Sequence, residues 1–101
     1  MGSMINTNYV KHMSSMFYNC SSLTSINLSN FNTNNVTNMD YMFSGCKPLA
    51  SLDISNFDCV KIQKLHFLKK MFEGCNSLKV KNIELNDFKI RQQAIVDLMN
   101  I

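Results

Sequence analysis

Several features that the sequence lacks narrow the class of protein. Tryptophan is missing, proline occurs once and glycine three times in a chain of 101 residues. So few glycines exclude a collagen-like chain and leave no glycine-rich loop for phosphate. No apolar run approaches the roughly 18 residues of a membrane span, and no segment at the start has the pattern of a signal peptide. The sequence therefore predicts one globular domain without a membrane segment.

Charge is scarce as well. Only 17 % of the residues are charged, and the formal net charge is +3, which makes nucleic acid an improbable partner without excluding it. Hydrophobic residues make up 46 % of the chain, an ordinary share for a globular protein. Asparagine and serine contribute 14 and 11 residues. Uncharged amides and hydroxyls therefore dominate the polar surface.

The strongest signal in the sequence is an internal repeat of 26 residues. A shift of 26 residues brings the first copy onto the second, aligning Met13 with Met39, Met16–Phe17 with Met42–Phe43, Cys20 with Cys46 and Leu28 with Ile54. A third copy follows with stretched spacing. It gains three residues between Ile62 and Met71, and two more between Leu78 and Leu85. Such short units cannot bury their apolar sides alone, so stacking into a solenoid is expected.

Each copy is expected to contain a short helix followed by a short strand. Val36, Met39 and Met42–Phe43 recur at helical spacing, which predicts helices over Val36–Phe43 and Val10–Phe17. Asn34 or Asn35 would cap the helix at its start, and a glycine, Gly45 or Gly74, would end it in a left-handed conformation. The pattern Leu49-x-x-Leu52-x-Ile54 then predicts a strand, which corresponds to Leu23–Leu28 in the first copy.

The segment Phe31–Cys46, FNTNNVTNMDYMFSGC, together with the following Leu49-x-x-Leu52-x-Ile54, resembles the BspA-like leucine-rich repeats of bacterial surface proteins. The resemblance covers residues 5 to about 88. It implies an α/β leucine-rich-repeat solenoid with a parallel strand ladder on one face and short helices on the other. It also implies a binding role without catalytic residues, because such relatives act as adhesins and interaction modules.

The chain divides into three parts. Residues 1–3 are interpreted as a scar of expression, residues 4–88 as about three repeats of 24–29 residues, and residues 89–101 as a C-terminal capping helix. The apolar side of that helix would carry Ile90, Ala94, Ile95, Leu98 and Met99.

Cysteine spacing gives no metal site. Cys20, Cys46 and Cys75 share one repeat position and predict a column of buried, reduced thiols, although strand spacing would also permit a Cys20–Cys46 disulfide. No Cys-x-x-Cys pair and no histidine cluster is present, so neither a metal nor another cofactor is expected. Cys59 lies off this column and is predicted to be the most exposed thiol.

Two groups of residues are candidates for binding. The first is the outward side of the strands, where residues between the core leucines point to solvent; it consists of Ser25, Asn27, Ser51, Asp53, Asn82 and Glu84. The second is a possible basic patch in the C-terminal part of the chain, suited to an acidic protein or to nucleic acid but also readable as a solvated helical face. It consists of Lys61, Lys64, Lys69, Lys70, Lys79 and Lys81.

The sequence therefore predicts a non-catalytic module that binds another protein. One alternative is a complete small cytoplasmic protein of mobile-element type, an inhibitor or adaptor that blocks a target enzyme such as one that handles nucleic acid. Another is a fragment of a surface adhesin, located at the cell surface. Repeat register from Ile5, directly after Met4, favours the complete protein. The first repeat has no evident cap, so we expect it to be covered either by a second copy, in a homodimer, or by the physiological partner.

Overall fold

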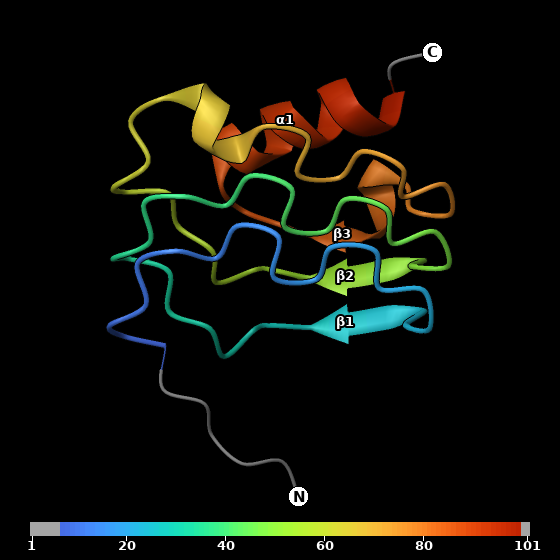
Figure 1. Cartoon of the computed structure of the whole chain (residues 1–101), viewed down its shortest axis with the longest axis horizontal. Helices are drawn as coiled ribbons and strands as arrows, with labels where there is room; N and C mark the ends of the chain where they lie inside the picture. Colours follow the sequence, from blue (N-terminus) through green and yellow to red (C-terminus); the bar gives the residue numbers. More distant parts are fainter. Residues whose placement is uncertain (1–6, 100–101) are drawn as a thin grey trace, which may run out of the picture.

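The computed structural model describes residues 7–99 and consists of layers stacked along one axis (Figure 1). The elements, in chain order, are β1 (Ser25–Asn27), β2 (Ser51–Asp53), the 3-10 helices η1 (Leu65–Leu68) and η2 (Val80–Asn82), β3 (Ile83–Glu84) and α1 (Phe88–Met99). The predictions for residues 1–6 and for 100–101 lie outside the described residues. The α/β class, the parallel strands and the C-terminal α-helix are confirmed.

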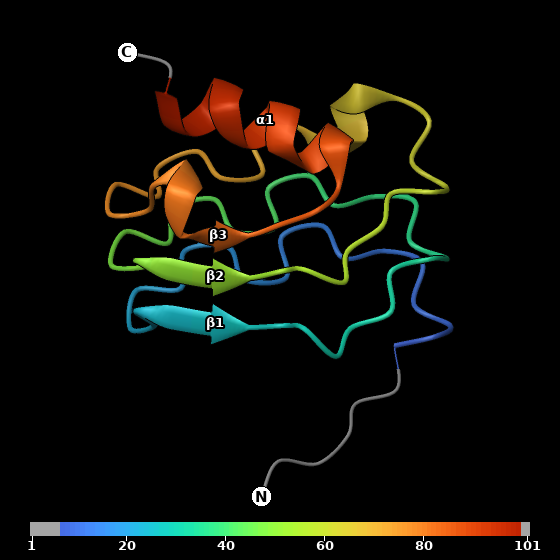
Figure 2. The ribbon, with the colours of Figure 1, turned by 180° about the vertical axis from the view of Figure 1, so that it is seen from behind.

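The strands form one parallel sheet in the order β1–β2–β3. Ile26 pairs with Leu52, and Leu52 pairs with Ile83. All three side chains are buried, because alternate residues of a strand point to opposite faces and one face of this sheet covers the core. The sheet lies on the side of the molecule that Figure 2 brings forward.

The opposite side of each copy is built of β-turns, so the predicted helices over Val10–Phe17 and Val36–Phe43 are wrong. The N–H of Met42 donates to the carbonyl of Met39, and the N–H of Cys46 donates to that of Phe43, both at 3.2 Å. These bonds span three residues, whereas an α-helix needs bonds that span four. We call this side the turn edge; it consists of residues 12–20, 38–46 and 67–75.

The third residue of each turn explains the conformation. Tyr41 and Gly45 have φ values of 57° and 78°, and Ser15, Asn19, Lys70 and Gly74 repeat this in the other copies. A positive φ at that position, with a bond across the four residues, is the signature of a type II turn. The predicted left-handed glycines are therefore present, but they complete turns and do not end helices.

Hydrogen bonds between copies replace the bonds of a helix. The N–H groups of Tyr41 and Phe43 donate to Lys69 and Met71 at 2.8 and 2.9 Å. Helical spacing predicted the buried residues of the second copy correctly, since Met39 and Met42 are fully buried, whereas Met16 in the first copy is 48 % exposed. Two successive β-turns direct the same residues toward the core as an α-helix would. Apolar residues at helical spacing therefore do not distinguish a pair of turns from a helix.

The extra residues of the third copy form the two 3-10 helices. η1 lies between Ile62 and Met71, and η2 lies between Leu78 and Leu85, where the sequence gains three and two residues. Each insertion is accommodated as a local turn at one side of the layer. The strand and the turn edge consequently remain in register with the second copy, as the pairing of Asp53 with Glu84 shows.

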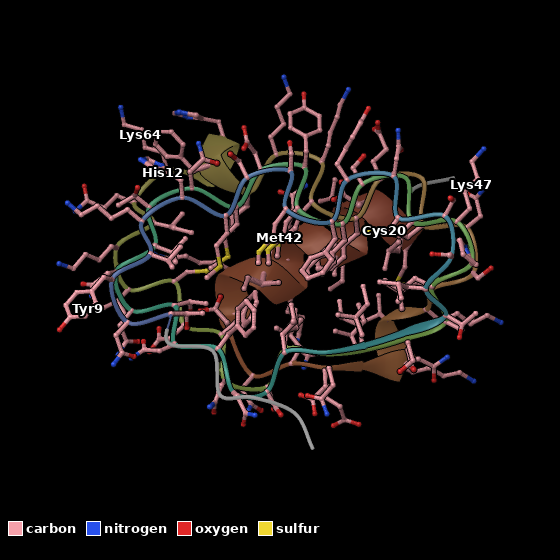
Figure 3. The ribbon with its side chains drawn as sticks, turned by 60° about the horizontal axis from the view of Figure 1, so that its bottom comes forward. Tyr9, His12, Cys20, Met42, Lys47 and Lys64 are labelled. Atoms are coloured by element: carbon pink, nitrogen blue, oxygen red, sulfur yellow. The ribbon has the colours of Figure 1, made fainter. Side chains whose placement is uncertain are left out.

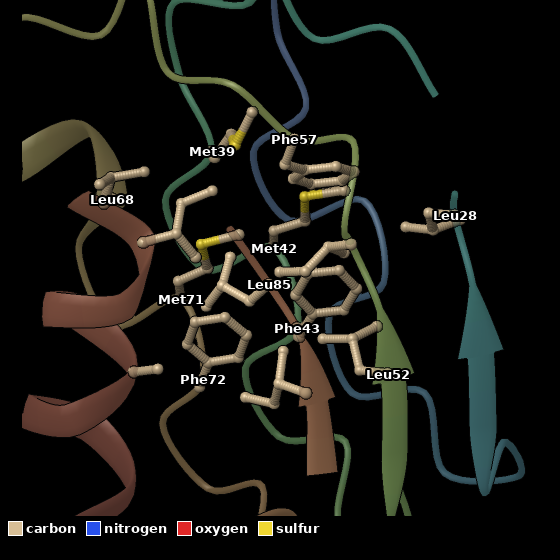
Figure 4. Close-up of a cluster of buried hydrophobic side chains, with 14 of the residues drawn as sticks. Leu28, Met39, Met42, Phe43, Leu52, Phe57, Leu68, Met71, Phe72 and Leu85 are labelled. Carbon is tan, nitrogen blue, oxygen red and sulfur yellow. The ribbon is translucent and has the colours of Figure 1, made fainter. Parts of the chain in front are cut away.

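The core is a set of side-chain columns enclosed by the stacked copies. The rings of Phe17, Phe43 and Phe72 stack with centroids 5.6 and 5.7 Å apart, and Figure 4 shows the last two between the sheet and α1. In Figure 3, along the stack, Met42 points inward and Tyr9 points outward. The columns bind successive copies together through burial of apolar surface.

Helix α1 covers the C-terminal end of the stack. Ile90 and Ala94 are fully buried, whereas Ile95 and Met99, predicted on the same side, are exposed. The Asp87 carboxylate caps the helix by accepting the N–H of Ile90 at 2.9 Å. Fewer residues of α1 are buried than the sequence predicted, because the helix lies on the flat end of the stack and only one side of it makes contact.

Candidate protein-binding face

The predicted strand-face residues come together in one shallow hollow. The hollow has a volume of about 210 Å³ and crosses all three strands, with Ile26 and Leu52 also in its lining. We call its polar lining the strand face; it consists of Ser25, Asn27, Ser51, Asp53, Asn82 and Glu84. Five of these six residues are exposed and Asp53 is half-buried.

Parallel register aligns the strand face in columns. Asn27 pairs with Asp53, and Asp53 pairs with Glu84, as the repeat alignment predicted. Neighbouring strands lie about 4.8 Å apart, so two carboxylates project side by side from adjacent strands. Like charges placed directly opposite each other in a sheet are unfavourable.

The Asp53 carboxylate is fixed in place by its own chain. Its Oδ1 accepts the N–H and the O–H of Ser55, at 3.0 and 2.7 Å. Asn27 accepts the N–H of Ser29 in the same way at 2.9 Å. These side-chain hydrogen bonds were not predicted, although Asp or Asn two residues before a serine is a recognisable signal for them. The Asp53 carboxylate therefore stabilises the turn that follows β2 and also places a negative charge on the strand face.

No cation of the described residues pairs with either carboxylate. The ion pair found within residues 7–99 joins Lys70 and Glu73 at 3.8 Å, on the turn edge. Glu84 is exposed at the end of the acidic column. The strand face is thus locally negative on a chain whose net charge is positive.

The predicted basic residues do not form one patch. Lys64 and Lys69 flank η1, whereas Lys79 and Lys81 belong to the segment of η2. These short helices lie at opposite sides of the molecule in both Figure 1 and Figure 2. Lys61 and Lys70 also belong to the η1 side by sequence, and all six side chains are exposed. The structure separates the group into two sets.

The cysteines depart from the prediction at two positions. Cys46 and Cys75 are buried and donate to the carbonyls of Phe17 and Phe43 at 3.0 Å, which confirms their column. The prediction that Cys59 is the most exposed thiol is wrong, since Cys59 is only 1 % exposed. Cys20, which was predicted to be buried, is half-buried. Cys59 takes the place of the buried Thr33 of the preceding copy, and Cys20 belongs to the first layer. All four cysteines are free thiols.

Burial governs the chemistry of these thiols. Desolvation raises the pKa of Cys46 and of Cys59, and it raises that of Cys75 to about 12. Deprotonation is therefore unfavourable at three of the four positions. Within residues 7–99 no group of three metal-ligating side chains is found.

A second polar hollow was not predicted. It has a volume of about 320 Å³ and lies where the chain leaves the strands, lined by Asn30, Phe31, Asn32, Asn34, Asn56 and Asp58. The signal was present as asparagines at corresponding positions of successive copies. The Asn32 side chain accepts the N–H of Asn34 and donates to the Asn8 side chain, both at 2.9 Å. Asn32 thus helps to shape the loop that lines this hollow.

The structure defines a small α/β protein built of repeated layers, with an exposed polar face along its parallel strands. A family model matches residues 3–100, and the chain belongs to that family, described as "Mycoplasma protein of unknown function, DUF285". No curated protein and no solved structure matches the chain. Among the described residues, no helix is long and apolar enough to cross a membrane.

Proposed function

We propose that the chain is a short leucine-rich-repeat solenoid of the BspA-like type, and that it binds another protein through the strand face without catalysing a reaction. The copies stack in register through backbone bonds and side-chain columns, which supports the solenoid. The strand face offers an open row of hydroxyl, amide and carboxylate groups, which supports recognition of a polypeptide.

The pairing of Asp53 with Glu84 is the observation that carries this proposal. Two carboxylates on adjacent strands repel each other when nothing neutralises them. A lysine or arginine side chain placed between them would relieve that repulsion and form charge-assisted hydrogen bonds. The partner that fits is therefore an extended, basic segment of another protein, lying across the three strands.

A selection from a displayed library of random peptides tests this function. The immobilised whole chain is expected to enrich peptides with clustered lysine or arginine, and their binding should weaken as salt rises. The double variant Asp53→Asn with Glu84→Gln should lose at least about tenfold in affinity for the same peptides, which corresponds to roughly 1.4 kcal/mol.

A matched control separates the strand face from net charge. Asp58→Asn with Glu73→Gln changes the net charge equally, but both residues lie off the strand face. This control should bind the selected peptides as the parent does. Equal losses in the two double variants, or enrichment of acidic peptides, would overturn the proposal.

The strand face does not distinguish an inhibitor or adaptor from a surface adhesin, because either could bind its partner through it. The location of the partner distinguishes them: an adhesin binds a molecule outside the producing cell, and an inhibitor binds an enzyme that shares its compartment. Nucleic acid is less favoured, because the lysines fall into two separated sets.

A further inference from the structure

The N-terminal end of the stack exposes positions that the other copies bury. Met16 is 48 % exposed, whereas its equivalents Met42 and Met71 are fully buried. Leu23 is 37 % exposed, whereas its equivalent Leu49 is fully buried. Phe17 and Cys20 are half-buried, in contrast to the buried phenylalanines and cysteines of the later copies. The first layer thus retains the surface that elsewhere receives another layer.

Backbone hydrogen bonds along the turn edge have one polarity. In the first interface, the N–H groups of Met13, Ser15, Phe17 and Asn19 donate to carbonyls of the second copy, at 2.8–2.9 Å. The second interface repeats this between the second and third copies. At the start of the turn edge the direction reverses once, where the N–H of Thr37 donates back to Lys11 at 2.7 Å. Each layer therefore directs turn-edge carbonyls toward the N-terminal end.

This polarity leaves a row of acceptors at the end of the first layer. By repeat equivalence the row consists of the carbonyl oxygens of His12, Ser14, Met16 and Tyr18, and no hydrogen bond within residues 7–99 reaches them. At the C-terminal end of the stack the groups that lack a following layer are N–H donors, and there the Asp97 carboxylate accepts the N–H of Phe72. A partner for the N-terminal end must supply donors at the spacing of the turn edge.

The polarity also discriminates between partners. Two first layers related by a two-fold axis that lays one turn edge over the other would bring carbonyl oxygens against carbonyl oxygens. Stacking two copies head to tail is obstructed as well, because α1 covers the end that would present donors. A second copy of this chain is therefore a poor occupant. A layer of the same 26-residue type, with its donor side uncovered, is a good one.

We propose that the N-terminal end is a docking edge for a segment that carries the same repeat unit and presents its turn-edge N–H groups. Such a partner adds a layer in the same orientation. Its phenylalanine stacks on Phe17, its strand pairs with the free edge of β1 and its N–H groups meet the acceptor row. This surface is distinct from the strand face and stands independently of the function proposed for that face.

A tethered partner layer provides the test. A unit with the sequence of residues 31–56 is joined ahead of Met1 by a flexible glycine–serine linker, which gives an effective concentration of about a millimolar. Docking should bury Cys20, so its reaction with a thiol reagent in the folded protein should slow at least about tenfold. The Phe17 amide should also gain protection from hydrogen exchange.

Two controls make the result decisive. The same tethered unit with Tyr41→Pro lacks one donor of the row and cannot adopt the positive φ, so it should protect Cys20 much less. Sedimentation of the untethered chain should show a monomer. Unchanged reactivity of Cys20 in the tethered protein, equal protection by the proline unit, or a dimer of the untethered chain that protects Cys20 would each overturn the proposal.

Discussion

The carboxylate of Asp97 stands in for a backbone carbonyl that the repeat would otherwise supply to Phe72. Its Oδ2 accepts the Phe72 N–H at 2.9 Å, while the equivalent N–H groups of Phe17 and Phe43 donate to carbonyls of the following copy. The side-chain amide of Gln93 donates a hydrogen bond to the other carboxylate oxygen, Oδ1, at 2.9 Å. Helix α1 thus ends the stack with a side chain where the next layer is lacking.

Removal of this acceptor should destabilise the chain. Asp97→Leu leaves the Phe72 N–H without a partner at the covered end, which costs about 1–3 kcal/mol for a buried donor. Asp97→Asn keeps an oxygen for that N–H and serves as the matched control. Urea unfolding at neutral pH should show a clear loss for the leucine variant and little or none for the asparagine variant; equal losses would contradict the capping role.

The same carboxyl group predicts a pH dependence of stability. Desolvation raises the pKa of Asp97 above its ordinary value of 3.8, against the opposing effect of its hydrogen bonds to Phe72 and Gln93. As the pH rises, the unfolded chain releases this proton first. The contribution of Asp97 is thus complete below pH 3.8 and declines as the pH passes the folded-state pKa. Between pH 3 and pH 7, urea midpoints of the parent should fall relative to Asp97→Asn; parallel curves would contradict the prediction.

The turn edge makes a prediction at Gly45. Its φ of 78° is costly for other residues, and a Cβ there would collide with the side chain of Asn19 in the layer below. Gly45→Ala should therefore lower the free energy of unfolding by at least about 1–2 kcal/mol. Asn19→Gly places glycine at the equivalent turn position and should cost far less. If alanine were tolerated at position 45 in thermal unfolding, the turn assignment would be wrong.

The thiols should differ in reactivity. Cys20 is half-buried in the open first layer, whereas Cys46, Cys59 and Cys75 are buried with raised pKa values. One thiol per folded chain should react quickly with a thiol reagent, and Cys20→Ser should abolish that fast phase. A fast phase that survives this substitution would show that another layer opens.

Alkaline pH should weaken the stack through Cys75. Its pKa is about 12 in the folded chain against an ordinary 9.0, so its contribution is complete below pH 9.0 and is lost as the pH rises toward 12. Urea midpoints measured at pH 8 and at about pH 10.5 should therefore fall less for Cys75→Ala than for the parent. An equal fall in both would assign the alkaline loss to other groups.

The sequence predicted the stack better than it predicted the elements within it. Repeat alignment identified the core columns and the strand register, because both depend on which residues recur and not on backbone dihedrals. It failed on the helices, since Tyr41 and Lys70 adopt a positive φ that their side chains do not signal. Only Gly45 and Gly74 carried that information, and they are compatible with a helix end as well as with a turn.

The sequence likewise predicted some features of the candidate site and missed others. Alternation along the strands predicts the strand face, although Asn82 is the last residue of η2 and not part of a strand. The hydrogen bonds from Ser55 to the Asp53 carboxylate depend on side-chain geometry and were missed. The buried state of Cys59 was missed because it occupies the place of Thr33, whose small buried side chain gave no apolar signal.

Photo-crosslinking in the producing cells is a direct test of whether a partner binds at the strand face. A benzophenone amino acid replaces Ser51 in the middle of the strand face or, as a control, the exposed Lys47 outside it. We expect a crosslinked polypeptide from position 51 that disappears with Asp53→Asn and Glu84→Gln and persists with Asp58→Asn and Glu73→Gln. Crosslinking from position 47 alone, or a product at position 51 that ignores the two carboxylates, would contradict it.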